Sequence, residues 1–310
     1  MTGTTMQARM TLARTRRRPL RNGQLPPSTL SRVLRGLALT VCCLLVLFPF
    51  AGVLTTSFAG PEDVARTGGL VMAPRTWSLD AYSAIFSGGV VTRALLISLV
   101  VTVVGTIGSM VVTTLLAYAL SSPIMVGRSW MLLLVLLSLL FSPGLIPNYL
   151  MVKQTGLIDS LWALIVPSML GAFNVIVVRA FFLGIPTELL QSARIDGAGE
   201  WAIFSRIVLP LSKAVLAVVG LFYAVGYWNA FFNVMLYIND QSKWTLQYVL
   251  RTYVVNNTRI GGSDVNVDAL PPQPALQMAI LVVSIVPVLL VYPFLQRHFA
   301  KGALTGAVKG

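Results

Sequence analysis

The fold is decided by the stretch Glu188-Leu-Leu-Gln-Ser-Ala-Arg-Ile-Asp-Gly-Ala-Gly-Glu-Trp-Ala-Ile-Phe-Ser-Arg-Ile-Val-Leu-Pro210. Pro186 blocks a helix before it, and Gly197 and Gly199 interrupt it in the middle, so the pattern predicts two short helices. Long hydrophobic segments lie on both sides of the stretch. The sequence therefore predicts a two-helix loop at a membrane surface, with Pro210 restarting a helix as the next apolar run begins.

Each of these two short helices has one distinct face. The spacing i, i+3, i+4, i+7 brings together four side chains of the first helix: Leu189, Ser192, Ala193 and Asp196. The same spacing groups large apolar side chains on the second helix: Trp201, Phe204 and Val208. Such a pair of faces suits docking into another protein. Asp196 is expected either to cap the second helix or to pair with a basic group of that partner.

The spacing resembles the EAA loop of ABC-importer permeases of the binding-protein-dependent (MetI-like) type. The chain reads Gln191-Ser192-Ala193, three residues, Gly197, nine residues, then Ile207-Val208-Leu209-Pro210. The family pattern is Glu-Ala-Ala, three residues, Gly, nine residues, then Ile-x-Leu-Pro. The sequence Ala193-Arg-Ile-Asp-Gly-Ala198 is similar to the corresponding segment of permeases in the carbohydrate-importer branch. Gln191 stands where the pattern has Glu, which removes the carboxylate that could form a salt bridge with a partner ATPase.

The resemblance makes this segment a coupling loop that contacts an ATPase. The residues that it assigns to the contact are Glu188, Gln191, Ser192, Ala193, Asp196, Gly197, Trp201, Phe204, Ile207, Leu209 and Pro210. Gly197 should need a small side chain or special backbone angles where the two helices meet.

The composition is that of a membrane protein. The chain has 310 residues, of which 56% are hydrophobic and 11% charged, whereas soluble domains carry about 25% charged residues. Segments expected on the cytoplasmic side hold 16 Lys and Arg with 3 Asp and Glu, and the opposite side holds 7 of each, so the net charge of +13 lies on one side. This positive-inside pattern sets the orientation. It also argues against a nucleic-acid-binding protein, which would need a basic patch on a soluble domain.

Six charge-free segments are long enough to cross about 30 Å of hydrocarbon. They are 36–60, 94–127, 129–152, 160–178, 214–239 and 269–296. We expect the second to end near residue 120 and the fourth to continue to Leu183, with Arg179 snorkelling to the cytoplasmic interface. Gly105 and Gly108 are expected to be close-packing sites. The prediction is an all-α polytopic membrane protein with six transmembrane helices, both termini in the cytoplasm, and the coupling loop at 185–212.

The two ends of the chain are predicted to lie outside this domain, which spans 29–298. Residues 1–28 contain arginines and no acid, so they predict a disordered basic cytoplasmic arm. A twin-arginine export signal is the alternative, but the apolar stretch behind it is too long. Residues 299–310 are expected to form a short cytoplasmic tail, rich in glycine.

No catalytic or metal chemistry is predicted. Cys42 and Cys43 are neighbours that would point to different faces of a helix, so a disulfide between them is implausible. The single His298 makes no metal cluster. The chain lacks the Gly-x-x-x-x-Gly-Lys-Ser/Thr phosphate loop, so we do not expect it to hydrolyse ATP. The predicted spans contain no Asp or Glu, which disfavours a proton-coupled carrier.

Candidates for contact with a transported solute lie in the fifth span. Aromatic rings can pack on the C–H face of a sugar, and amides can hydrogen-bond its hydroxyls. The candidates are Tyr223, Tyr227, Trp228, Asn229, Phe231, Phe232 and Asn233, with Asn174 added from the fourth span. The wording Trp-Asn-x-Phe-Phe-Asn also resembles sugar permeases. The alternative is that these residues serve helix packing and the interfacial aromatic belt, and that Asn174 makes a hydrogen bond between helices.

The resemblance implies an importer of several subunits in the bacterial cytoplasmic membrane. The expected partners are a second homologous permease, two cytoplasmic ATPase subunits, an external solute-binding protein, membrane lipid and a sugar or oligosaccharide. No cofactor is expected in this chain, because ATP and Mg²⁺ would bind the ATPases. The alternatives are an importer of the same fold for a peptide, amino acid or phosphate, and a membrane assembly or sensor protein that transports nothing.

Overall fold

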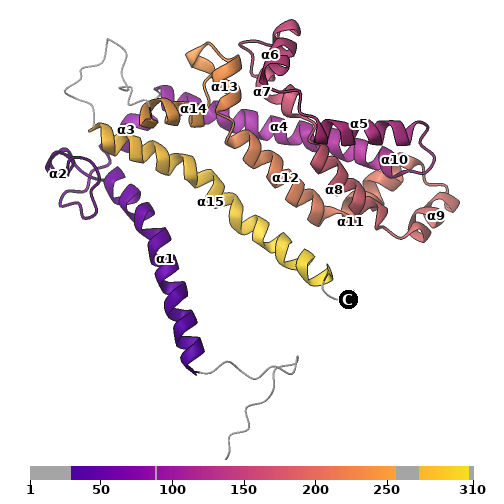
Figure 1. Cartoon of the computed structure of the whole chain (residues 1–310), viewed down its shortest axis with the longest axis horizontal. Coiled ribbons are helices and arrows are strands. Elements are labelled where there is room, and N and C mark those ends of the chain that lie inside the picture. Colours follow the sequence, from indigo (N-terminus) through magenta and orange to yellow (C-terminus); the bar gives the residue numbers. More distant parts are fainter. Residues whose placement is uncertain (1–28, 88, 256–271, 307–310) are drawn as a thin grey trace, which may run out of the picture. The chain divides into compact units, whose positions relative to one another are not determined.

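The computed structural model describes residues 29–87, 89–255 and 272–306 (Figure 1). The predicted basic arm, residues 1–28, lies outside this part of the chain. The described elements are all helices, with one isolated antiparallel bridge between Ala59 and Trp77. The all-α class is therefore confirmed. The chain divides into two compact units, Met1–Ala51 and Gly52–Gly310.

The described part of the first unit belongs to helix α1, Thr29–Ser57. The helix has 29 residues, which at about 1.5 Å per residue exceeds the thickness of the hydrocarbon core. Its apolar side chains are exposed along most of its length, and Cys42 and Cys43 are exposed and free. An apolar helix of this length suits a lipid environment.

Helix α4, Val90–Ser121, forms the centre of the second unit (Figure 1). It packs against α12, Lys213–Trp228, and against α8, Ala172–Leu183. Helix α12 also packs against α15, Gln273–Gly306. The end of α4 at Ser121 and the end of α8 at Leu183 agree with the sequence analysis.

Two glycines of α4 permit this close packing. A Cβ atom on Gly105 would lie 2.8 Å from the ring of Tyr227, and one on Gly108 would lie 3.2 Å from Cε of Met169. Real Cβ atoms do not tolerate the first distance, so only glycine fits against this ring. The expectation that both glycines are close-packing sites is confirmed.

The third predicted span, 129–152, is not one continuous helix. Helix α5, Arg128–Leu140, ends before Pro143 and Gly144, and α6, Leu145–Gln154, begins after them. Pro143 has no N–H to continue the helix, and Gly144 has φ of +82°. The predicted span 129–152 is thus divided at Pro143 and Gly144.

The fourth predicted span is bent. Helices α7, Trp162–Ile165, and η1, Val166–Ser168, meet α8 at 50°. The hydroxyl of Tyr223 accepts a hydrogen bond from the N–H of Gly171 at 2.9 Å, and it also bonds to the hydroxyl of Thr113 at 2.7 Å. These two bonds fix the bend against α4.

The fifth predicted span, 214–239, is interrupted at residues 229–231. Helix α12 ends at Trp228, and the chain continues through α13, Phe232–Tyr237. Three short helical segments follow it: η3, Gln241–Lys243; α14, Leu246–Leu250; and η4, Arg251–Val255.

A polar cluster joins this region to the turn before α7. Asp159, whose φ is +62°, accepts hydrogen bonds from the N–H groups of Asn239 at 3.1 Å and Asp240 at 3.0 Å. The ammonium of Lys243 lies 3.4 Å from the Asp159 carboxylate and 3.5 Å from that of Asp240. The N–H of Asp240 is the largest of the causes that lower the pKa of Asp159. Nothing local in the sequence signals this cluster.

The segment after α1 folds around one carboxylate. It contains α2, Pro61–Thr67, and α3, Asp80–Phe86. The buried carboxylate of Asp63 accepts hydrogen bonds from the N–H groups of Arg75 at 2.7 Å and Thr76 at 2.9 Å. These bonds lower the pKa of Asp63 below its ordinary value, and the bond from the Thr76 N–H has the largest effect.

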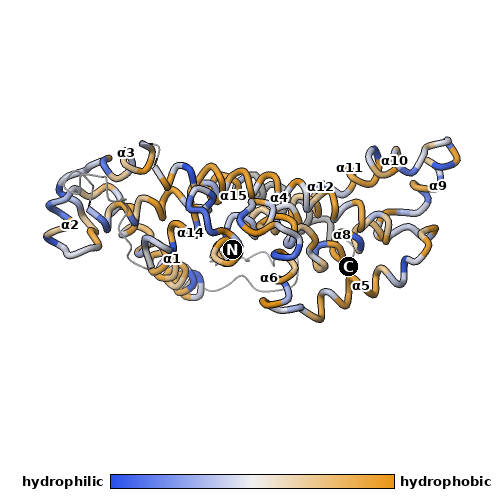
Figure 2. The backbone as a smooth tube through the Cα atoms, turned by 90° about the horizontal axis from the view of Figure 1, so that it is seen from above, coloured by the Kyte–Doolittle hydropathy of each residue, from blue (hydrophilic) through white to orange (hydrophobic). Residues whose placement is uncertain are grey.

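Among the described residues, three helices could cross a membrane by length and composition, or up to five if each bent pair forms one span. The three are α1, α4 and the Gln273–Val291 part of α15, while α5 is a shorter apolar helix. The predicted count of six spans is not confirmed, because α5 alone is too short. Figure 2 shows hydrophobic residues predominating along α4, α12 and α15, and hydrophilic residues gathering at α2 and α9. The predicted tail, 299–310, continues the helix α15 as far as Gly306.

Candidate functional site

The loop 185–212 contains the two short helices that the sequence predicts. Helix α9 runs Thr187–Ile195, directly after Pro186. The second begins with α10, Glu200–Ile203, and continues as a π-helix, η2, Phe204–Val208, and as α11, Leu209–Leu211. The chain then turns by 83° into α12.

Gly197 makes the connection between the two helices. Its φ of +82° is left-handed, which a residue with a side chain adopts only at a cost. Its N–H donates to the carbonyl of Arg194 at 3.1 Å, and the N–H of Ala198 donates to that of Ala193 at 2.9 Å. This pair of bonds is the Schellman motif, which closes the end of α9. The need for special backbone angles at Gly197 is therefore confirmed.

The helix passes through Pro210 instead of restarting there. Pro210 has no N–H for the carbonyl of Arg206, and its ring would clash with that carbonyl in a regular α-helix. The wider π-helix just before the proline gives room for this defect. The break falls two residues later, at Ser212, so the predicted restart at Pro210 is wrong.

The second helix divides its apolar side chains between inside and outside. Phe204 and Val208 are buried, whereas the Trp201 side chain is 69% exposed. Ile195, at the end of α9, is 85% exposed. The interpretation of Trp201, Phe204 and Val208 as one docking face is thus corrected: Trp201 points outward and the other two face the core.

The remaining predicted loop residues lie mostly at the surface. Asp196 is the C-cap residue of α9 and makes no capping bond to the second helix, whose N-cap is Gly199. The role of Asp196 as a cap of the second helix is therefore wrong. Four of these residues are exposed: Glu188, Gln191, Ser192 and Pro210. Three others are half-buried: Ala193, Ile207 and Leu209.

A polar and aromatic contact ties the loop to α4. The Tyr118 hydroxyl donates to Oε2 of Glu200 at 2.6 Å, and Nε of Arg194 donates to Oε1 of Glu200 at 2.9 Å. The ring of Tyr118 lies 4.9 Å from that of Phe204 between centroids. One carboxylate thus joins α9, α10 and the end of α4. This contact could not be predicted from the sequence, because Tyr118 and Glu200 are 82 residues apart and share no motif.

In the second group of candidates, the aromatic residues of α12 have partners inside the chain. Tyr227 bonds to the hydroxyl of Ser109 at 2.8 Å and donates to the carbonyl of Ile165 at 3.2 Å. The indole of Trp228 donates to the carbonyl of Ser284 at 3.1 Å. With the bonds of Tyr223 described above, this pattern favours helix packing for all three residues. A role for them in a solute path stays a prediction.

The candidates after α12 are more open. Asn229 is exposed and donates to the carbonyl of Val225 at 2.9 Å. Phe232 is exposed, and the guanidinium of Arg251 lies 4.9 Å from the centroid of the Phe231 ring. Asn233 lines a cavity of about 160 Å³ together with Tyr223 and Tyr227. Asn174 is buried within α8. A role of any of these residues in the solute path stays a prediction.

Known proteins similar to this chain are components of transport systems. The family model described as "Binding-protein-dependent transport system inner membrane component" matches residues 94–304. This match includes α4 from residue 94 onward, the loop 185–212 and all of the solute-path candidates. The chain belongs to this family. It is therefore an inner-membrane transport subunit and not an enzyme.

Relatives of this permease are transport proteins. It is 46% identical over 88% of its length to a Bacillus subtilis protein, of which 96% is covered, the polygalacturonan/rhamnogalacturonan transport system permease protein YtcP. It is 30% identical over 86% of its length to the arabinooligosaccharides transport system permease protein AraQ of Halalkalibacterium halodurans, of which 92% is covered. A solved structure of a bacterial ABC transporter involved in the import of the acidic polysaccharide alginate matches with a TM-score of 0.80 and 27% identity. That match covers 89% of the permease and 100% of the compared chain.

Within the described residues, no group of three or more His, Cys, Asp or Glu side chains could hold a metal ion. At the loop 185–212, the exposed polar side chains of Glu188 and Gln191 accompany the exposed apolar side chains of Ile195 and Trp201. Those side chains suit contact with another protein and transmission of movement.

Proposed function

We propose that this permease imports a sugar or oligosaccharide and is driven by partner ATPases that dock on the loop 185–212. In this proposal, two cytoplasmic ATPase subunits, a second homologous permease and an external solute-binding protein complete the importer. ATP and Mg²⁺ bind the ATPases. The loop and both termini lie in the cytoplasm, as the distribution of charge predicts.

The observation that carries the proposal is that the loop has an exposed apolar side and another side in contact with α4. Outward, Ile195 and Trp201 present exposed apolar side chains that a partner groove would cover. Inward, Glu200 and Phe204 contact Tyr118 at the end of α4. A movement of the ATPase against the outer side would therefore reach the central helix through the inner side.

The carbohydrate substrate is supported by the relatives and by the open region after α12. Both named relatives and the solved transporter handle carbohydrate chains according to their names. Arg251, stacked on Phe231, offers a guanidinium with fixed geometry, which would suit a carboxylate of an acidic sugar. The exposed Asn229 offers an amide to sugar hydroxyls.

Co-purification of the ATPase from the native host tests the docking part. We expect Trp201→Ala to reduce the ATPase recovered with the solubilised permease at least fivefold, because a large apolar anchor is lost. Trp77→Ala is the matched control, since Trp77 is 68% exposed, almost as much as Trp201, but lies in the segment after α1. Equal recovery of ATPase with both variants would contradict docking at the loop.

A further inference from the structure

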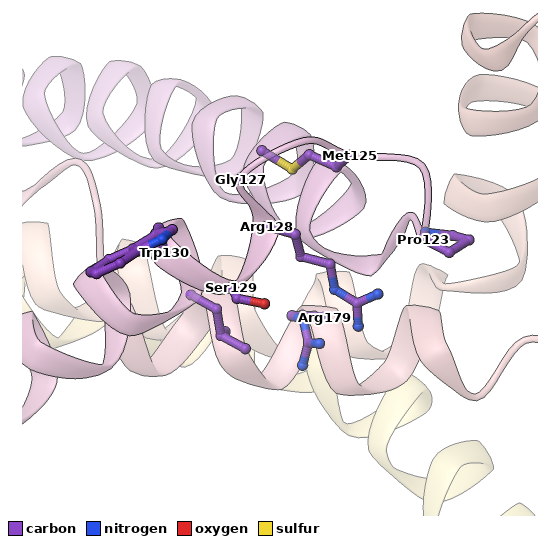
Figure 3. Close-up of a pocket in the computed structure, with 8 residues that line it drawn as sticks. Pro123, Met125, Gly127, Arg128, Ser129, Trp130 and Arg179 are labelled. Carbon is purple, nitrogen blue, oxygen red and sulfur yellow. The ribbon is translucent and has the colours of Figure 1, made fainter.

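A basic cavity lies beside the loop end of α4 and has no role in the function described so far. It has a volume of about 540 Å³, and its lining includes Arg128, at the start of α5, and Arg179, in α8. Figure 3 shows both side chains directed into the same space. A cavity of this size can hold a ligand as large as a phospholipid headgroup.

The two guanidinium groups lack an acidic partner in the part of the chain that the structure describes. No carboxylate there lies within salt-bridge distance of Arg128 or Arg179. Nε of Arg179 donates to the carbonyl of Leu120 at 3.0 Å, which anchors the side chain to the end of α4. The terminal nitrogens of Arg179 and the whole guanidinium of Arg128 remain for another acceptor. Two like charges directed into one cavity repel each other until an anion lies between them.

The surroundings of the cavity are those of a membrane interface. Trp130, which also lines the cavity, is 74% exposed, and Val126, in the turn before α5, is 95% exposed. Tryptophan is enriched at the level of lipid headgroups, with its ring toward the acyl chains. A soluble anion would gain nothing from these apolar side chains, whereas a lipid would contact them with its glycerol and upper acyl groups.

We propose that this cavity binds the phosphodiester headgroup of an anionic phospholipid, with Arg128 and Arg179 paired to the phosphate oxygens. Arginine forms bidentate hydrogen bonds to phosphate, and two arginines from different helices can bind it from two sides. The bound lipid joins α5 and α8 at the same end of the molecule as the loop. Its leaflet is the cytoplasmic one, a point that rests on the proposed orientation.

Native mass spectrometry of the detergent-purified full-length permease, titrated with phosphatidylglycerol, tests the proposal. We expect Arg128→Gln/Arg179→Gln to bind phosphatidylglycerol about tenfold to thirtyfold more weakly than the wild type. Arg32→Gln/Arg35→Gln, in α1, removes the same number of charges from the same predicted side and should bind within about twofold of the wild type. Equal binding by the wild type and the Arg128/Arg179 variant would overturn the site.

Four further measurements distinguish the proposed lipid from other anions and from misfolding. Phosphatidylcholine, whose headgroup is neutral overall, should bind the wild type at least tenfold more weakly than phosphatidylglycerol, and equal binding would overturn the assignment. Displacement of phosphatidylglycerol by an excess of inorganic phosphate would show a site for free anions instead. Displacement by the stoichiometric ATPase would show that an acidic group of that partner occupies the cavity. Arg128→Lys/Arg179→Lys keeps both charges but loses the bidentate geometry, so it should bind phosphatidylglycerol more weakly than the wild type and more tightly than Arg128→Gln/Arg179→Gln. Binding as weak as that of the Gln variant would contradict a role of the two charges.

Discussion

At the scale of single residues, Glu200 is where the loop meets the central helix. Its carboxylate is half-exposed, so its ion pair with Arg194 contributes only about 0–1 kcal/mol to stability. The Glu200 carboxylate instead connects elements, because it accepts hydrogen bonds from α9 and from α4 at the same time. The Tyr118 ring also contacts Phe204, so both polar and apolar contacts connect the loop with α4.

Removal of the Tyr118 hydroxyl tests this link. Tyr118→Phe keeps the ring against Phe204 and loses only the bond to Glu200, which is worth about 1 kcal/mol or about fivefold in an equilibrium. We expect uptake per ATP hydrolysed to fall by up to about fivefold in reconstituted importer, while ATPase recovery is unchanged. Tyr149→Phe is the control, because Tyr149 stacks on Tyr237 and its hydroxyl has no hydrogen bond among the described residues. Unchanged uptake per ATP in Tyr118→Phe would exclude a role of this bond in coupling.

At the scale of elements, the contact between α4 and α12 holds the second unit together. Gly105 lets the ring of Tyr227 lie against the backbone of α4, and the hydrogen bonds of Tyr227 to Ser109 and Ile165 prevent the ring from moving away. A side chain added at Gly105 therefore has no easy relief.

Two alanine substitutions test this packing. We expect Gly105→Ala to destabilise the permease by about 1–3 kcal/mol, because its Cβ would overlap the tyrosine ring. Gly226→Ala, in α12, meets no atom within 4 Å and should be neutral or stabilising by up to about 1 kcal/mol, since alanine favours a helix. Thermal unfolding in detergent measures both. A Gly105→Ala protein as stable as Gly226→Ala would show that the helices are not in contact there.

The segment after α1 should lose its order in acid. The pKa of Asp63 is lowered in the folded chain, so its stabilising effect is complete above the ordinary value of 3.8 and is lost as the pH falls through the lower folded pKa. The protection of the N–H groups of Arg75 and Thr76 against hydrogen exchange, relative to the intrinsic rate at each pH, should therefore fall in that acidic range. Asp63→Asn should show fast exchange already at neutral pH. Asp80→Asn, which removes a carboxylate without a described hydrogen bond, should behave as wild type, and protection that persists in Asp63→Asn would disprove the role of this carboxylate.

At the scale of the whole molecule, local patterns predicted the loop and the helical class, but not the breaks in the spans. The glycine and proline spacing from Gly197 to Pro210 is local, so it identified the two short helices from the residues alone. The breaks at Pro143 and at Gly171 depend on whether tertiary partners satisfy the freed backbone groups, as Tyr223 does for Gly171. The link between Tyr118 and Glu200 depends on how distant segments pack, which no spacing records.

At the scale of the whole molecule, the coupling proposed for the loop also depends on the backbone geometry between its two helices. The proposed mechanism needs the two short helices to keep a fixed angle while the ATPase moves against them. That angle depends on the left-handed backbone at Gly197, where a substituted residue would cost about 1–2 kcal/mol in strain and more if it is β-branched. Gly199, two residues later, has φ of −69° and carries no such constraint.

The most direct test of coupling through this loop is to measure sugar uptake and ATP hydrolysis together in reconstituted importer carrying Gly197→Val or Gly199→Val. A Cβ at either position meets no atom within 4 Å, so the two variants differ mainly in backbone strain. We predict that Gly197→Val inserts normally and hydrolyses ATP but loses most of its uptake, whereas Gly199→Val keeps both. Normal uptake by Gly197→Val would contradict the assignment of this loop as the coupling element.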